Sequence, residues 1–215
     1  MDSISKPKKL YIICFIIQIP SIIITAFAPI IMNNNNKSNQ SLYCQIFHNL
    51  SDRCASEFRK LLPSGYSSYC YGLPGFDILI CIFLAAIIGI FFIVYCIIFV
   101  KKINNNLKKD NCSIVFFVIF IIFLIFVSIA VIDLMPQGTS VAGYCNNDRV
   151  GEGIGRAQTT TAIGIIDIFL ILAIIVTTII KIIILLKSNN DNNNLQEAQL
   201  MNEENYNQNA LYPNS

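Results

Sequence analysis

The sequence carries few charged residues. Asp, Glu, Lys and Arg together make up 13% of the 215 residues, against 54% hydrophobic residues and a mean hydropathy of +0.60. A soluble domain carries about a quarter charged residues, so this shortage excludes water as the only solvent of the chain. The net charge is only +2, and the lysines stand in short groups beside apolar runs. A nucleic-acid partner therefore has no support in the sequence.

Tryptophan and histidine are also scarce. Tryptophan is absent, and the only histidine, His48, has no nucleophile, base or metal ligand at a spacing that would form a site. The acidic and hydroxyl residues inside the apolar runs do not converge on a catalytic set either. We therefore expect a protein that is not an enzyme and that uses no metal or cofactor.

The chain is rich in long apolar runs. The four runs are residues 10–32, 74–100, 113–135 and 160–186. Each is long enough to cross the roughly 30 Å of bilayer hydrocarbon as a helix. Inside lipid every backbone N–H and C=O must bond within its own segment, so runs rich in Ile and Phe become helices despite their high β propensity. The sequence predicts an all-α membrane fold, a bundle of four transmembrane helices in a lipid bilayer.

Lysine placement predicts the orientation of these helices. Lysines flank the cytoplasmic ends of membrane helices, and here they precede the first run, fill the connection between the second and third, and mark the end of the fourth. They are Lys6, Lys8, Lys9, Lys101, Lys102, Lys108, Lys109, Lys181 and Lys187. The other two connections mix basic with acidic residues, so we expect them to face outward. Both termini are then cytoplasmic, in a plasma membrane or an endomembrane.

This topology divides the rest of the chain. The predicted cytoplasmic parts are the N-terminus 1–9, the turn 101–112 and the tail 187–215. The tail is polar and has no apolar periodicity, so we expect it to be flexible. The predicted outer loops are residues 33–73 and 136–159.

The first run has one alternative interpretation, a cleavable signal peptide. A basic start, an apolar stretch and the A-x-A triplet from Ala26 to Ala28 are typical of such a signal. Pro29 would then follow the cut, and proline there disfavours cleavage. The apolar stretch also continues to Met32, so we expect a retained helix; cleavage would leave three spans.

The eight cysteines fall on both sides of the membrane. Cys44, Cys54, Cys70 and Cys145 lie in the outer loops, and the other four lie in or under the membrane. Small loops in an oxidising compartment are stabilised by cross-links, so we expect two disulfides. Three pairings are possible. The nine-residue gap favours Cys44 with Cys54, which leaves Cys70 with Cys145 to join the loops; alternatively, Cys70 or Cys145 is unpaired or bonded to another chain.

Short motifs predict two kinds of covalent modification. Asn39-Gln40-Ser41 and Asn49-Leu50-Ser51 are glycosylation sequons in the first outer loop, which makes Asn39 and Asn49 the expected glycan sites of a glycoprotein. Cys112 and Cys96 lie near the inner membrane edge beside lysines, and we regard them as palmitoylation candidates.

Polar residues inside the runs are costly and are functional candidates by default. Asp77, Asp133 and Asp167 lie near the outer ends of the last three runs. One hypothesis is a ring of carboxylates that lines a cation or proton path. The alternative is that Asp77 occupies a favourable helix N-terminus and that Asp133 reaches water.

Asp167 and Gln18 lie deeper in the membrane. Asp167 is about 10 Å below the entry of its helix, so it should face a partner inside the bundle, such as Gln18 or Arg156. Gln18 and Pro20 together indicate a kink in the first helix whose freed carbonyl bonds a neighbour, a packing role.

Several local motifs accompany this layout, among them Thr25-Ala26-Phe27-Ala28-Pro29 near the outer end of the first run and Leu42-Tyr43-Cys44 in the first outer loop. Layout and motifs together resemble the claudin and peripheral-myelin-protein superfamily. The first motif is similar to the Thr-Ala-Leu-Pro exit of that family's first helix, and the second to a degraded Gly-Leu-Trp-x-x-Cys motif. Leu61-Leu62-Pro63 is similar to the run after the family's second cysteine. The chain departs from the family in having no tryptophan and in carrying the extra pair Cys70 and Cys145.

The resemblance implies a small extracellular antiparallel β-sheet above the four-helix bundle, with Cys44 and Cys54 joining neighbouring strands. Tetraspanins place the larger loop second and carry a Cys-Cys-Gly motif, and connexins carry three cysteines in each outer loop; this chain has neither pattern. The alternative is a tetraspan protein outside these families.

Two functional hypotheses follow. The first is a membrane-organising, adhesion or accessory protein whose disulfide-braced outer loops contact copies of itself or other membrane proteins. The second is a channel or transporter subunit that uses the outer-leaflet carboxylates. Neither the partner nor the transported species follows from the residues.

Overall fold

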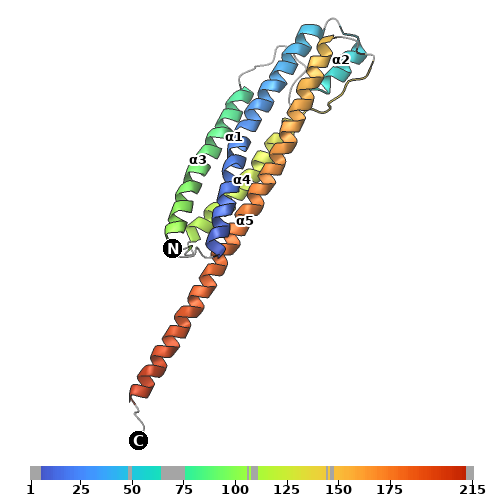
Figure 1. Cartoon of the computed structure of the whole chain (residues 1–215). Helices are drawn as coiled ribbons and strands as arrows, with labels where there is room; N and C mark the ends of the chain where they lie inside the picture. Colours follow the sequence, from blue (N-terminus) through green and yellow to red (C-terminus); the bar gives the residue numbers. More distant parts are fainter. Residues whose placement is uncertain are drawn as a thin grey trace.

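The computed structural model describes residues 6–47, 50–63, 76–105, 107, 111–143, 145 and 148–211, and side chains within these ranges up to residue 187 except for 76–78 and 148. This part of the chain is helical and contains no strand. Its five helices are α1 (Lys6–Ile46), α2 (Asp52–Arg59), α3 (Phe76–Asn104), α4 (Asn111–Asp133) and α5 (Asp148–Leu211). Figure 1 shows α1, α3, α4 and α5 running alongside one another, with the short α2 at one end.

Four helices of the described part are long and apolar enough to cross a membrane, which confirms the prediction of a multi-pass membrane protein. Their outer faces carry large apolar side chains: Phe83 on α3 is 66% exposed, Phe126 on α4 is 64% exposed and Phe169 on α5 is 68% exposed. Such faces are stable against lipid and not against water. The bundle centre is apolar as well, with Phe120, Leu124 and Val127 of α4 packed against α1, α3 and α5.

Helix α1 is longer than its apolar run. The predicted outer loop from residue 33 is instead helical as far as Ile46. Asn33, Asn36 and Asn39 recur every three residues and are all buried on one face. Asn36 Nδ2 donates to the Leu134 carbonyl at 2.8 Å, and Asn39 Nδ2 donates to the Gly153 carbonyl at 3.1 Å. These tertiary bonds override the poor helix propensity of asparagine.

Helix α5 runs along the whole bundle from the end that carries α2 and extends past the opposite end of the bundle (Figure 1). From Val150 to Leu185 a row of buried positions alternates three and four residues apart. The row is Val150, Gly153, Ala157, Thr160, Gly164, Asp167, Ile171, Ile174, Thr178, Lys181 and Leu185, and Ile184 is buried beside it. This average of 3.5 residues is the spacing of a left-handed coiled-coil seam, and α1 is the main partner along it.

The tail after Lys187 also differs from the prediction. In place of a flexible segment, the backbone of α5 continues as helix to Leu211. Residues 195–204, Leu-Gln-Glu-Ala-Gln-Leu-Met-Asn-Glu-Glu, are mostly strong helix formers. Composition alone suggested disorder, whereas an established helix end lowers the free energy of adding further helical residues.

The end of the molecule that carries α2 is here called the cap. It consists of α1 from residue 33, α2, the connection after α4, and α5 as far as residue 157. Helix α2 begins at Asp52 because the Ser51 side chain accepts a hydrogen bond from the Cys54 N–H at 3.3 Å, a helix N-cap. No strand is present in the described part of the cap. The predicted sheet that would join Cys44 and Cys54 is not seen, because these residues lie in α1 and α2.

Candidate functional site

The cap has its own small apolar core. Phe58 of α2 is fully buried and stacks on Tyr43 of α1 with ring centroids 5.5 Å apart. Gly153 of α5 lies directly beneath the Phe58 ring: a Cβ atom there would be 2.8 Å from Phe58 Cζ. Two backbone bonds add to this packing, from Gly138 N–H to the Lys60 carbonyl at 2.7 Å and from Gln137 N–H to the Leu62 carbonyl at 3.3 Å. The cap is therefore packed from all four of its parts, α1, α2, the connection after α4 and α5.

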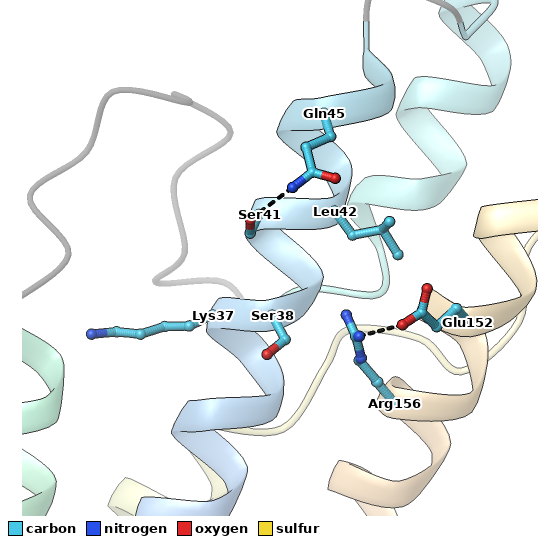
Figure 2. A pocket seen from close by; sticks show the side chains of 7 residues that line it. All are labelled: Lys37, Ser38, Ser41, Leu42, Gln45, Glu152 and Arg156. Atoms are coloured by element: carbon cyan, nitrogen blue, oxygen red, sulfur yellow. Dashed lines mark hydrogen bonds and ion pairs between the residues drawn. The ribbon is translucent and has the colours of Figure 1, made fainter.

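A polar pocket of about 400 Å³ opens between α1 and α5 in the cap (Figure 2). Its lining residues are Lys37, Ser38, Ser41, Leu42 and Gln45 of α1 with Glu152 and Arg156 of α5. Figure 2 shows the Arg156 guanidinium between the two helices, ion-paired with Glu152 one turn away, whereas the Lys37 ammonium extends away from the pocket. Hydroxyls, an amide, a cation and an anion thus surround one opening.

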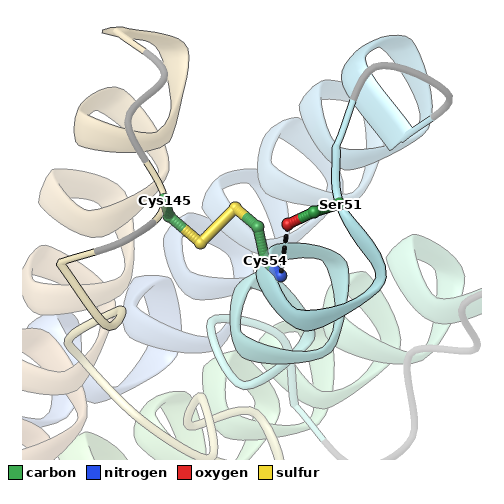
Figure 3. The surroundings of a disulfide bond; sticks show 3 residues. All are labelled: Ser51, Cys54 and Cys145. Carbon is green, nitrogen blue, oxygen red and sulfur yellow. Dashed lines mark hydrogen bonds between the residues drawn. A yellow bond between two sulfur atoms is a disulfide. The ribbon is translucent and has the colours of Figure 1, made fainter.

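A disulfide between Cys54 and Cys145 braces the cap (Figure 3), with Cα atoms 5.1 Å apart and a sequence separation of 91. It joins α2 to the segment that leads into α5. The predicted pairs Cys44–Cys54 and Cys70–Cys145 are therefore wrong. Cys44 is also disulfide-bonded, and Cys70 lies outside the described residues.

The pairing differs from the prediction because the gap between Cys44 and Cys54 does not form a hairpin. The chain remains helical through Ile46 and starts α2 at Asp52, so the two cysteines lie on separate helices. The connection after α4 folds over α2 and brings Cys145 to Cys54. Cys14, Cys81, Cys96 and Cys112 form no disulfide.

A second polar group lies inside the bundle at the opposite end from the cap. Gln18 of α1 is fully buried, and its Nε2 donates to the Ile174 carbonyl at 3.0 Å, to Thr177 Oγ1 at 2.6 Å and to Thr178 Oγ1 at 2.9 Å, all on α5. Its Oε1 accepts from Lys181 Nζ at 2.7 Å and from the Tyr95 hydroxyl. One side chain therefore joins α1, α3 and α5. The predicted packing role of Gln18 agrees with this arrangement.

Lys181 is the central cation of this group. Its side chain is fully buried, and Nζ lies 4.4 Å from the ring centroid of Tyr95, 5.1 Å from Tyr11 and 5.2 Å from Phe15. Three aromatic faces can stabilise a desolvated ammonium by about 2 kcal/mol or more. The sequence had placed Lys181 at the cytoplasmic end. The sequence feature that could have indicated burial is the position of Lys181 three residues after Thr178, which places both side chains in the same row of buried positions on α5.

Asp167 lies in the bundle interior, as predicted, but without the predicted partners. It is fully buried, and the Thr25 side chain of α1 faces it. Gln18 is bonded to α5 and Arg156 is paired with Glu152. Within the described part of the chain, neither Asp167 carboxylate oxygen has a partner at hydrogen-bond geometry.

The three aspartates do not form a ring in the described residues. Asp133, at the end of α4, is exposed, whereas Asp167 is enclosed. Asp77 is in α3, and its side chain lies outside the described residues. Asp167 and Lys181 are also kept apart, because 14 residues of helix separate them by roughly 21 Å.

The predicted modification sites differ in accessibility. Asn39 is 1% exposed and bonded to α5, so a glycan there is incompatible with this fold. Asn49 lies outside the described residues. Cys112 is exposed and Cys96 is partly exposed, near the end of the bundle opposite the cap. The Cys112 and Cys96 side chains are therefore accessible for acylation, whereas the Asn39 side chain is not accessible for glycosylation.

No protein family, no curated protein and no solved structure matches the chain. The pairing and the sheet that the claudin resemblance implied are not found in the described residues. Membership of that superfamily stays a prediction from the sequence.

Proposed function

We propose that the chain is a membrane-organising tetraspan protein that contacts neighbouring membrane proteins, or further copies of itself, through the cap. In this proposal the cap faces the cell exterior or a lumen, and both termini face the cytoplasm. The lysine distribution supports this orientation. The Cys54–Cys145 disulfide also supports it, because disulfides persist in oxidising compartments.

The observation that carries the contact function is the continuity of α1 and α5. Both helices pass from their apolar runs into the cap without a break. The disulfide then fixes α2 to the chain that enters α5. Because Phe58 of α2 packs against Tyr43 of α1 and Gly153 of α5, a contact made by α2 bears directly on both of these helices. The interior polar group links the membrane helices to one another as well, because Gln18 of α1, Tyr95 of α3 and Lys181 of α5 are hydrogen-bonded together.

Reconstitution tests this proposal. Labelled protein at low density in a bilayer should form clusters that single-molecule photobleaching counts, or should dock vesicles that carry the same protein. Cys54→Ser with Cys145→Ser should reduce either activity, because α2 loses its brace. Wild-type protein that stays monomeric and docks no vesicle contradicts contact between copies of the chain.

A second candidate is a channel or transporter subunit, which Asp167 favours. A carboxylate buried in a membrane bundle without a hydrogen-bond partner in the described residues is costly, and such residues often mark ion or proton paths. Vesicles loaded with a pH- or Na⁺-sensitive dye would report flux, and Asp167→Asn should abolish it. Contact activity with no flux in the wild type supports the first candidate over the second.

A further inference from the structure

The membrane-facing side of the polar pocket of Figure 2, at Arg156, lies at the height of lipid headgroups. On α5, Arg156 is four residues beyond the start of the apolar run at Thr160, or roughly 6 Å at the rise of an α-helix. On α1, Ser38 is six residues beyond Met32, or roughly 9 Å. The headgroup layer on each side of a bilayer extends about 5 to 8 Å beyond the hydrocarbon. Arg156 therefore lies within this layer and Ser38 just outside it, whereas Glu152 lies farther out, roughly 12 Å beyond the hydrocarbon.

The pocket offers groups of both charges side by side. Among the described residues Arg156 donates to Glu152, and its other guanidinium N–H groups can donate at an opening that the Ser38 and Ser41 hydroxyls also line. Guanidinium and hydroxyl groups bind phosphate oxygens. The Glu152 side chain is 54% exposed and can pair with an ammonium at the same opening. A ligand with a phosphate and an ammonium close together satisfies both, whereas a simple anion would face the carboxylate as well.

Apolar side chains continue from the pocket toward the membrane centre. Ile31 and Phe27 lie two and three helical turns below Ser38 on the same face of α1 and are 46% and 57% exposed. On α5, Ile166 lies four turns below Glu152 and is 57% exposed. A molecule with its polar end in the pocket can therefore lay hydrocarbon chains along this face.

We propose that the pocket binds the headgroup of a zwitterionic phospholipid, with its phosphate on Arg156 and Ser38 and its ammonium, the outermost part of the headgroup, on Glu152. The contact function proposed above is not needed for this site. The site also does not depend on which side of the membrane the cap faces, since it rests on depth and on the paired charges.

Native mass spectrometry of the full chain in detergent, titrated with phosphatidylcholine, tests the proposal. Arg156→Gln combined with Ser38→Ala should lower the affinity about tenfold or more, because charge-assisted bonds to the phosphate are lost. Arg53→Gln is the matched control: it removes the same charge from an exposed position on α2 that does not line the pocket. It should bind phosphatidylcholine as the wild type does. Mapping of the Cys54–Cys145 link in each variant verifies that the cap is folded.

Glu152→Gln gives a readout that a merely structural role would not produce. Without the carboxylate, the pocket keeps its phosphate donors and loses its ammonium acceptor. The ratio of phosphatidylcholine to phosphatidylglycerol binding should then fall about tenfold relative to the wild type. An equal loss of both lipids in this variant would overturn the headgroup assignment.

Inorganic phosphate separates a lipid site from a site for a free anion. Millimolar phosphate should leave bound phosphatidylcholine in place, because it offers neither the ammonium nor the acyl chains. Displacement of the lipid by phosphate would instead assign the pocket to a soluble anion. Undiminished lipid binding in the variant that combines Arg156→Gln with Ser38→Ala would also overturn the proposal.

Discussion

Gln18 is the residue on which the polar interior of the bundle depends. It is fully buried, donates to three groups of α5 and accepts from Lys181 and Tyr95. A buried ammonium is stable only while its hydrogen bonds are made, since an uncompensated buried charge costs several kcal/mol. The buried polar group that joins α1, α3 and α5 therefore depends on a single amide.

Gln18→Leu should lower the free energy of unfolding by about 3 kcal/mol, because it leaves the Lys181 ammonium without its amide acceptor. Adding Lys181→Met should recover part of that loss, because the stranded charge is removed. Unfolding in mixed SDS and maltoside micelles measures both. Gln158→Leu, at an exposed position, should change stability by less than about 0.5 kcal/mol. Additive losses in the double variant would contradict the coupling.

Gly153 is required where α5 passes under Phe58. Gly153→Ala places a Cβ atom 2.8 Å from Phe58 Cζ and 2.9 Å from Cε2. Overpacking of this kind costs about 1 to 3 kcal/mol, which exceeds the helix-propensity gain of about 1 kcal/mol. The thermal midpoint in detergent should therefore fall. Gly151→Ala and Gly155→Ala have open space around the added Cβ and should leave it unchanged or raise it. Equal midpoints for all three variants would show that the Phe58 contact does not form.

At the scale of elements, α2 is the described helix that is least stable on its own. It has only eight residues, far fewer than the roughly 12 to 15 at which an isolated helix becomes even marginal in water. Its N-cap at Ser51, the buried Phe58 ring and the link to Cys145 hold it in place. The disulfide should therefore matter more for α2 than for the membrane helices.

Cys54→Ser should reduce the stability of the cap by about 2 to 5 kcal/mol while leaving the bundle folded. Hydrogen exchange would show this as faster exchange of α2 amides with little change in α3 and α4. Nonreducing peptide mapping of the wild type should recover a Cys54–Cys145 peptide. Cys112→Ser, at an exposed position that forms no disulfide, is the control and should change neither readout. Recovery of a Cys44–Cys54 peptide would contradict the pairing.

At the scale of the whole molecule, the proposed orientation places the two ends of the bundle in different compartments. A tag at either terminus should be protected from protease added to intact cells, whereas a tag inserted at Ser140, in the exposed connection of the cap, should be cut. Permeabilised cells serve as the control, because all tags should then be cut. Protection of the Ser140 tag together with cleavage of the terminal tags would invert the orientation.

The four spans follow from the sequence alone. Lipid leaves an apolar run of this length no stable backbone structure except a helix, so length and hydropathy were sufficient. The interior position of Asp167 also followed, because a carboxylate seven residues into a span avoids lipid.

Only the tertiary structure decided what these residues meet. The sequence around Asn33, Asn36 and Asn39 predicts a loop, but in the folded chain these side chains are buried and α1 continues through them into the cap. From the sequence Lys181 is predicted to mark the cytoplasmic end of its helix, whereas in the structure Gln18 and three aromatic rings surround it. Cys54 pairs with Cys145 because chain folding, and not the spacing of cysteines, sets which sulfur atoms come together. Apolar length is a local property of the chain, whereas hydrogen-bond and disulfide partners are set by contacts between distant segments.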